Sequence, residues 1–188
     1  MKGRLKWAVG VAVLAGAAAV GTVAVAGGGN EVREDLTGYE EVPAISTTGN
    51  GSFKAKIDRN GQQISYRLSY AELEGTVTQA HIHIGQRAVN GKIAAFLCSN
   101  LPSPPPGTPA CPAAPGTVEG TIEAADVLDT TTPPPETAGQ GIEAGAFGEL
   151  VDAIGAGVTY ANVHTTKWPG GEIRAQLEDD HRGGDRDD

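Results

Sequence analysis

The sequence predicts an all-β, mainly antiparallel domain, an Ig-like or Greek-key β-sandwich of about seven to nine strands with one short helix. Apolar and polar residues alternate along several short segments, which is the period of a half-buried strand. Clusters of Gly and Pro separate these segments, as turns do in such folds. One stretch near residue 150 instead repeats its apolar residues at helical spacing.

The clearest alternation lies in two segments that a short turn joins. Residues 53–58 (FKAKID) and 63–70 (QISYRLSY) each place apolar side chains on every second position. Asn60-Gly61 lies between them and is typical of a hairpin turn, because both residue types adopt a positive φ readily. These segments therefore predict a β-hairpin with one buried and one solvated face.

The rest of the domain is expected to add further strands and one helix. Apolar residues of 146–157 (AFGELVDAIGAG) recur three and four positions apart, which predicts a short helix lying across an end of the sheets. Residues 99–116 and 129–141 are rich in Pro, Gly and Thr and are expected to form surface loops. The further strands are expected at 78–84, 92–97, 117–124, 157–165 and 170–177.

The first 26 residues have the pattern of a signal peptide for export. Three basic residues precede an apolar run, and Ala24-Val25-Ala26 offers small residues for cleavage near Ala26. A retained membrane anchor is the alternative, because the run approaches the roughly 20 residues that span a bilayer. Either way we expect the rest of the chain to be secreted or extracytoplasmic, with no stable membrane insertion after cleavage.

The chain is expected to divide into four parts. A signal peptide at 1–26 and a flexible segment at 27–34 precede the folded domain, residues 35–177, which is long enough for one core. Residues 178–188 have no apolar side chain and are expected to form a disordered acidic tail. The formal net charge of -9 argues against a nucleic-acid partner, which would need clustered Lys and Arg.

Cys98 and Cys111 are the two cysteines of the sequence. They bracket a Pro-rich segment that cannot form a packed element of its own. In an oxidising compartment the expected state is a disulfide that closes this loop. Such a bond would staple one excursion of the chain and would not be the framework of the fold.

Three histidines of the predicted domain lie on predicted strands. His81 and His83, in QAHIHIG, share one strand face because positions two apart point the same way. His164, in YANVHTT, shares a face with Asn162 by the same count. If the two strands meet, three imidazoles converge, a ligand set that suits copper or zinc.

Other roles for these residues stay open. The histidines can be polar strand residues that bind only neighbouring strands or water. They can also hold an anion together with Arg87 or Arg174. Around a metal, Asn162, Glu172 and Arg174 would form the second shell, and we expect Glu172 to form a cross-strand ion pair or to hydrogen-bond to His164.

Three segments of the sequence closely resemble the CHRD domain, the module named after chordin and found also in exported bacterial proteins. They are LTGYEEVPAISTTGNG at 36–51, AHIHIG at 80–85 and YANVHTTKWPGGEIRAQL at 160–177. The resemblance covers essentially the whole predicted domain and departs from the usual pattern at Ala44 and Ala175, where Pro and Gly are common. It implies a secreted, single-domain β-sheet protein of the bacterial type with no settled activity. Growth-factor binding does not carry over, since the cysteine-rich modules of chordin are missing here.

We therefore expect an exported binding protein without established catalysis, with His81, His83 and His164 as a hypothetical site for copper or zinc. Its partner would be an unknown extracellular ligand or protein. One alternative is a structural or protein-interaction module without a metal, and another is a copper-dependent redox enzyme. We do not predict an enzyme, because the sequence has no G-x-S-x-G or H-E-x-x-H motif and no fourth histidine within the domain.

Overall fold

The computed structural model describes residues 30–132 and 139–178. The predicted export signal at 1–26 lies outside the described residues, as does the predicted acidic tail apart from Glu178.

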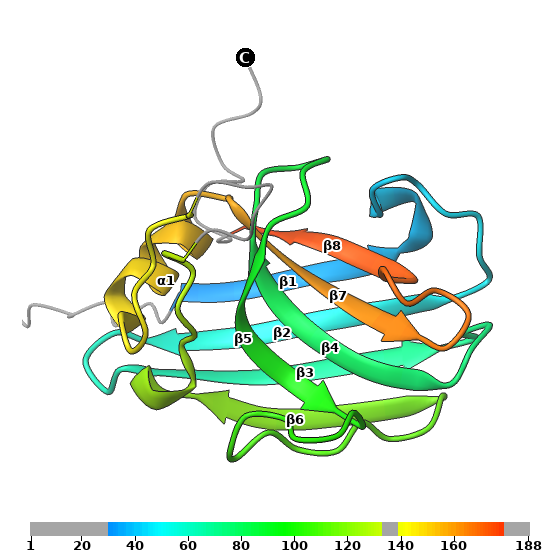
Figure 1. Ribbon diagram of the computed structural model, residues 1–188, viewed down its shortest axis with the longest axis horizontal. Coiled ribbons are helices and arrows are strands. Elements are labelled where there is room, and N and C mark those ends of the chain that lie inside the picture. The colour runs from blue at the N-terminus through cyan, green and yellow to red at the C-terminus, as the bar shows by residue number, and fades with distance from the viewer. Residues whose placement is uncertain (1–29, 133–138, 179–188) are drawn as a thin grey trace, which may run out of the picture.

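Within the described residues, eight strands form one antiparallel sheet that folds back on itself into two layers (Figure 1). The strand order is β5-β4-β7-β8-β1-β2-β3-β6, so the first four strands of this order make one layer and the last four make the other. The all-β, antiparallel class predicted from the sequence is confirmed. The strands are β1 (Asn30–Thr37), β2 (Asn50–Asp58), β3 (Gln63–Ala71), β4 (Val77–Ile84), β5 (Lys92–Ser99), β6 (Gly116–Ile122), β7 (Thr159–Thr165) and β8 (Ile173–Leu177).

The two layers are continuous, whereas a sandwich consists of two separate sheets. They join where β1 pairs with β8, at Thr37 and Arg174. The right-handed twist of a sheet lets a single sheet curl in this way until its inner face closes on itself. The fold is therefore sandwich-like in its layers and close to a barrel in its connectivity.

The first strand corrects one sequence prediction. Residues 30–34, expected to be flexible, belong to β1, which pairs with β2 from Asn30 and Ile57 to Thr37 and Asn50. The strand was hard to recognise because the half-buried Glu34 stands between the buried Val32 and Leu36 and breaks the inward apolar row. Residues 30–34 thus belong to the sheet of the folded domain.

The predicted hairpin is confirmed as β2 and β3. Their residues pair from Asn50 and Ala71 to Asp58 and Gln63, with alternating burial along both strands. The turn is held by Asp58, whose Oδ1 accepts hydrogen bonds from the backbone N–H groups of Asn60 and Gly61. This layer has the buried and solvated faces that its period of two predicts.

One α-helix, α1 (Phe147–Gly155), packs across one end of the two layers (Figure 1). Its buried side chains are Phe147, Leu150, Val151 and Ile154, the residues whose spacing predicts the helix. Two short 3-10 helices, η1 (Gly38–Glu40) and η2 (Ala124–Asp126), lie in connecting loops. Among the described residues, no helix is long and apolar enough to cross a membrane.

The predicted disulfide joins Cys98 at the end of β5 to Cys111, 13 positions later. The loop between them also fastens itself through Asn100, whose side chain bonds to the backbone N–H and C=O of Cys111. The Pro-rich segment is therefore a closed excursion attached to the edge strand, as the sequence predicts.

The layer that carries the histidines differs from the hairpin layer because both of its faces are covered. All residues of β7 and β8 are buried. Ala161 and Val163 belong to the apolar core, while the opposite face of β7 carries Tyr160, Asn162 and His164. Irregular segments close over that face, and Asn90 ties two of them together by donating to the carbonyl of Val42. The polar face of β7, which by its alternation could have faced water, is thus buried inside the protein.

Candidate metal centre

The structure brings His81, His83 and His164 together. β4 and β7 are antiparallel neighbours in which His81 lies opposite Asn162 and Gln79 opposite His164. His164 is therefore diagonal to His81 on the shared face, within the reach of long side chains across a sheet. One ring nitrogen from each histidine lies within 4.8 Å of the other two. We call these three residues the histidine cluster.

The cluster is almost fully enclosed. His81 is 0% exposed, and His83 and His164 are each 7% exposed. Phe96 of β5 packs edge-on against the His81 ring, with 4.4 Å between the ring centroids. Ligands held on strands and enclosed by packing are fixed in place better than ligands on loops.

A backbone carbonyl contacts Nδ1 in two of the rings. Nδ1 of His83 lies 3.0 Å from the carbonyl oxygen of Gly91, and Nδ1 of His164 lies 2.9 Å from that of Pro169. A carbonyl oxygen only accepts hydrogen bonds, so Nδ1 carries the proton in His83 and its Nε2 carries a lone pair. In His164 both nitrogens face oxygen acceptors, Nδ1 the carbonyl of Pro169 and Nε2 the Oδ1 of Asn162, so either nitrogen can carry the proton. Nε2 of His83 is buried and has no hydrogen-bond partner.

His81 completes the set. Its Nε2 lies 3.1 Å from Oε1 of Gln79, and its Nδ1 lies 3.2 Å from Nε2 of His164. When Gln79 accepts the proton of Nε2, Nδ1 of His81 is a lone pair as well. With the proton of His164 on Nδ1, each of the three rings has one nitrogen with a lone pair, and a shared cation would stabilise this arrangement.

Burial keeps the rings neutral. Desolvation, together with the nearby His164, lowers the pKa of His81 to about 2 and the pKa of His83 to about 4. The pKa of His164 is also lowered, mainly by burial. Neutral imidazole is the form that binds metals, so the cluster needs no deprotonation at neutral pH.

The spacing fits an ion with modest adjustment. Metal–nitrogen bonds of about 2.0 to 2.1 Å in a tetrahedral site place two nitrogens about 3.3 Å apart. The 3.2 Å between His81 and His164 matches this value. The upper limit of 4.8 Å exceeds it, so closing the set around an ion requires a shift of about 1 to 2 Å in one ring.

A stack of aromatic and cationic groups supports the third ring. Tyr160 lies parallel to His83, with 4.7 Å between the centroids. The guanidinium of Arg174 lies over the Tyr160 ring, 3.3 Å from its centroid. Arg174 also donates to the carbonyls of Gln86 and Val89 and is fully buried. Arg174 therefore supports the cluster through Tyr160, and its donors are occupied by the protein.

Of the residues expected to surround the metal ligands, one contacts the histidine cluster directly and the others do not. Asn162 is in contact with the cluster, with its Oδ1 3.1 Å from Nε2 of His164. Arg174 reaches His83 only through Tyr160. Arg87, the other residue considered for an anion, forms an ion pair with Glu40 at the surface.

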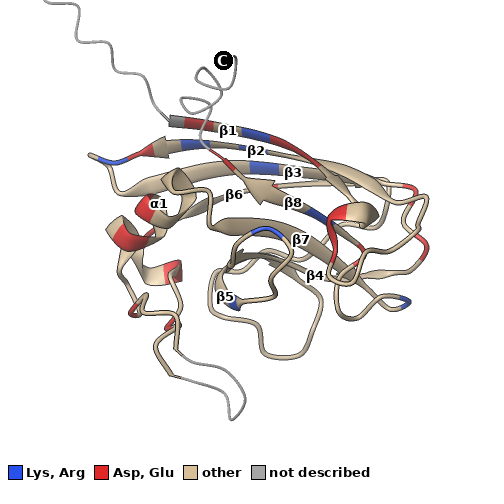
Figure 2. Cartoon of the chain, turned by 90° about the horizontal axis from the view of Figure 1, so that it is seen from above, with Lys and Arg blue, Asp and Glu red and all other residues tan. Residues whose placement is uncertain are grey.

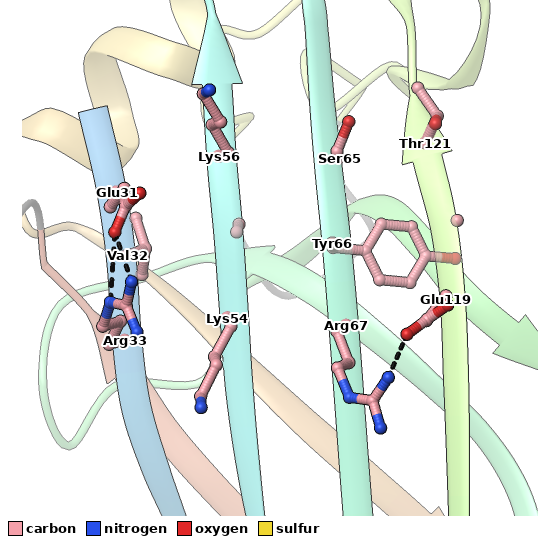
Figure 3. Close-up of a pocket in the computed structure, with 12 residues that line it drawn as sticks. Glu31, Val32, Arg33, Lys54, Lys56, Ser65, Tyr66, Arg67, Glu119 and Thr121 are labelled. Carbon is pink, nitrogen blue, oxygen red and sulfur yellow. Dashed lines mark hydrogen bonds and ion pairs between the residues drawn. The ribbon is translucent and has the colours of Figure 1, made fainter. Parts of the chain in front are cut away.

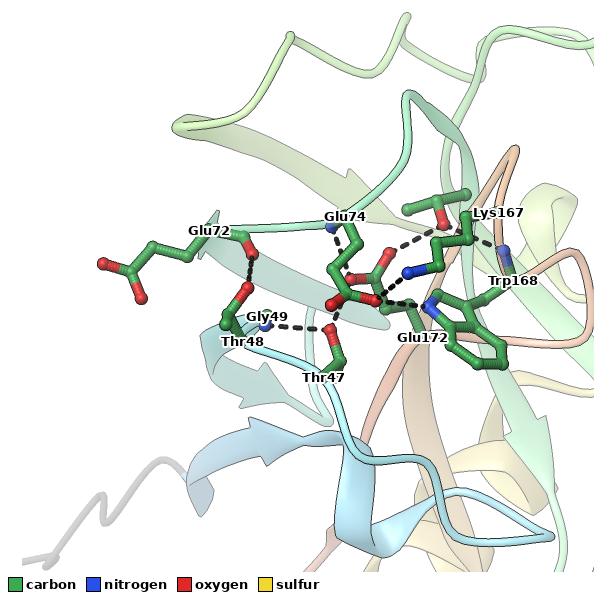
Figure 4. A network of polar contacts seen from close by, with 9 residues as sticks. Thr47, Thr48, Gly49, Glu72, Glu74, Lys167, Trp168 and Glu172 are labelled. Atoms are coloured by element: carbon green, nitrogen blue, oxygen red, sulfur yellow. Dashed lines mark hydrogen bonds and ion pairs between the residues drawn. The ribbon is translucent and has the colours of Figure 1, made fainter.

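Glu172 departs from its predicted role. Its carboxylate accepts hydrogen bonds from the side chains of Thr47 and Thr165 and from the backbone N–H of Glu74 (Figure 4). No bond to His164 is among these, so the predicted contact is wrong. Glu172 lies just before β8, and its side chain holds three segments together beyond the end of the histidine face.

Sequence reasoning also missed Glu41. It follows η1 and is 6% exposed, and its Oε1 lies at Gly171 together with Nδ2 of Asn162. Its Oε1 is buried without a hydrogen-bond partner. Desolvation raises the pKa of Glu41 to about 7, although Arg174 and Asn162 lower it. The one signal in the sequence was its place in the segment 36–51, where the neighbouring residues gave no reason to expect burial.

A second cluster of charge lies on the outer face of β1, β2, β3 and β6, where Figure 2 shows basic residues on neighbouring strands. Ion pairs join Arg33 to Glu31 and Arg67 to Glu119 (Figure 3). The residues of this face line a shallow pocket. The two ion pairs neutralise part of its basic charge, so the pocket has mixed charge and we assign no ligand to it. Its four cationic residues are Arg33, Lys54, Lys56 and Arg67.

A comparison with family models gives a match for the described domain. The chain matches the family model of the CHRD domain over residues 32–177, which includes the whole histidine cluster. No curated protein and no solved structure gave a match. The chain belongs to the CHRD-domain family.

Proposed function

We propose that this protein is an exported, single-domain binding module that holds one copper or zinc ion through His81, His83 and His164. The observation that carries the proposal is the convergence of their ring nitrogens within 4.8 Å in a buried space. Buried polar atoms normally have hydrogen-bond partners, and Nε2 of His83 has none. An ion would use this lone pair together with those of His81 and His164.

The ligand chemistry favours a borderline metal. Neutral imidazoles suit zinc and copper, whereas calcium and magnesium prefer oxygen ligands. Three histidines leave a fourth position open, as in zinc and copper sites that bind a water molecule. The outer contacts of the rings to Gly91, Pro169 and Gln79 have the form of the second-shell hydrogen bonds that orient metal ligands.

An exported location supports this function. The disulfide between Cys98 and Cys111 suits an oxidising compartment. The signal pattern at residues 1–26 provides a route to that compartment. A binding module is proposed in preference to an enzyme because the cluster is enclosed. A copper-dependent redox activity stays a prediction that turnover assays of the loaded protein can test.

The test is a calorimetric titration of the metal-free protein with Cu(II) and with Zn(II). We expect the natural protein to bind one ion per chain. The affinity of His81→Ala/His83→Ala should be lower by a factor on the order of 100 or more, because this variant lacks two of the three ligands. His181→Ala is the matched control, because it removes a histidine outside the domain. Equal affinity of the double variant and the natural protein, with both folded by circular dichroism, would refute the site.

A further inference from the structure

Glu41 is the buried group that the proposed function leaves without a role. It belongs to the segment 36–51, whereas its neighbours Asn162 and Gly171 belong to the segment 160–177. The fold thus brings Glu41, from the loop before β2, to residues of β7 and of the loop before β8. A carboxylate with one oxygen buried and unpartnered is costly unless it receives a partner.

The position of Glu41 is fixed by its neighbours. Its Oε1 lies against Gly171 together with Nδ2 of Asn162, and Oδ1 of Asn162 lies 3.1 Å from Nε2 of His164. Gly171 closes the other side, where a Cβ atom would lie 2.4 Å from Oε1 of Glu41 and 2.8 Å from Nδ2 of Asn162. Gly171 has a φ of +127°, so glycine meets both the steric and the backbone requirement there. The hairpin therefore packs its backbone directly onto the Glu41–Asn162 pair.

Charge points to the same role. A divalent ion on three neutral imidazoles would place two positive charges near the buried Arg174. Glu172, the fully buried carboxylate of this layer, is occupied by Thr47, Thr165 and Glu74. Glu41 is a buried carboxylate with an unpartnered Oε1, and this atom lies at Gly171 beside Nδ2 of Asn162, the residue whose Oδ1 contacts His164.

We infer that Glu41 accepts a hydrogen bond from the ligand that completes the coordination of the bound ion. This inference rests on the proposed function and specifies the fourth ligand of the same site. That ligand is a neutral molecule with an O–H or N–H group, such as water. An anion without an O–H or N–H group, such as azide, cannot donate to Glu41 and would be repelled by its charge, so the site discriminates against such anions.

The experiment is an azide titration of the copper-loaded protein, followed by the charge-transfer absorption band of copper-bound azide. We expect weak azide binding to the natural protein and an affinity higher on the order of 100-fold for Glu41→Gln, which removes the repelling charge at similar volume. Glu41→Ala should also raise the azide affinity, because it removes the same charge. Glu41→Asp keeps the charge and stays weak.

Glu40→Gln is the matched control. Glu40 is the adjacent residue, but its carboxylate pairs with Arg87 at the surface, so its azide affinity should equal that of the natural protein. Copper bound with full histidine dependence but with equal azide affinity in Glu41→Gln would overturn the inference and leave the proposed function standing. Absence of histidine-dependent copper binding would overturn both.

Discussion

Replacing Glu41 with Gln should change how the stability of the metal-free protein depends on pH. Burial raises the pKa of Glu41 from 4.5 to about 7. An acid whose pKa is raised in the folded state stabilises the fold fully below its unfolded pKa, and this contribution disappears as the pH rises through the folded pKa. The natural protein should therefore lose stability between pH 4.5 and pH 7, and the loss is complete above that range.

The size of this loss follows from the shift. At about 1.4 kcal/mol for each pH unit, it amounts to roughly 3 kcal/mol of unfolding free energy. Glutamine has a similar shape but does not ionise, so the variant lacks this loss. Other groups titrate equally in both proteins, and the difference between the two curves isolates Glu41.

The assay is urea denaturation of both proteins in a chelator, in steps from pH 4.5 to pH 8.5. The stability of Glu41→Gln relative to the natural protein should rise by roughly 3 kcal/mol across this range. Two curves that stay parallel within about 0.5 kcal/mol would refute the reasoning, because the buried carboxylate would then titrate as in the unfolded chain.

Three further predictions concern the same molecule. In the Glu41→Gln background without metal, stability should fall as the pH drops from 6.5 toward 4, because burial lowers the pKa of His83 to about 4 while the unfolded ring is protonated first. An unfolding free energy from urea denaturation that stays constant over that pH range would contradict this prediction. Replacing Cys98 and Cys111 with Ser should lower the unfolding free energy by about 3 kcal/mol and leave one metal site per chain. A midpoint unchanged in urea would show that the loop needs no closure. Glu172→Ala should cost roughly 3 kcal/mol, because it leaves donors of Thr47, Thr165 and Glu74 unpaired in the interior. Copper titration of that variant should still give one site, and loss of the site would place Glu172 in the metal centre.

Period and spacing were sufficient to predict the elements that are regular along the sequence. The strands of β2 and β3 follow from their alternation, and α1 follows from its apolar spacing. The shared face of His81 and His83 follows from their separation of two positions. Their meeting with His164 needed one further fact, the pairing of β4 with β7, which the sequence does not contain.

Covering loops explain what could not be predicted. The histidine face alternates like a solvated strand face, but irregular segments bury it, and irregular segments have no period to read. Glu41 lies in such a segment, and its burial depends on Asn162 and Gly171, which are more than 100 positions away. Glu172 was expected to contact His164 because the two residues were predicted to lie on neighbouring strands. In the structure its carboxylate instead accepts hydrogen bonds from Thr47 and Thr165.

The contact between His81 and His164 joins positions 83 residues apart in the chain. An ion held between them would act as a reversible cross-link that removes the entropy of a long loop from the unfolded ensemble. Because an ion that binds only the folded state also lowers the population of opened chains, the loaded protein would be cut more slowly by proteases. If the protein is exported as proposed, the concentration of available metal would then set how long each molecule survives, because proteases would degrade the metal-free form faster than the metal-bound form.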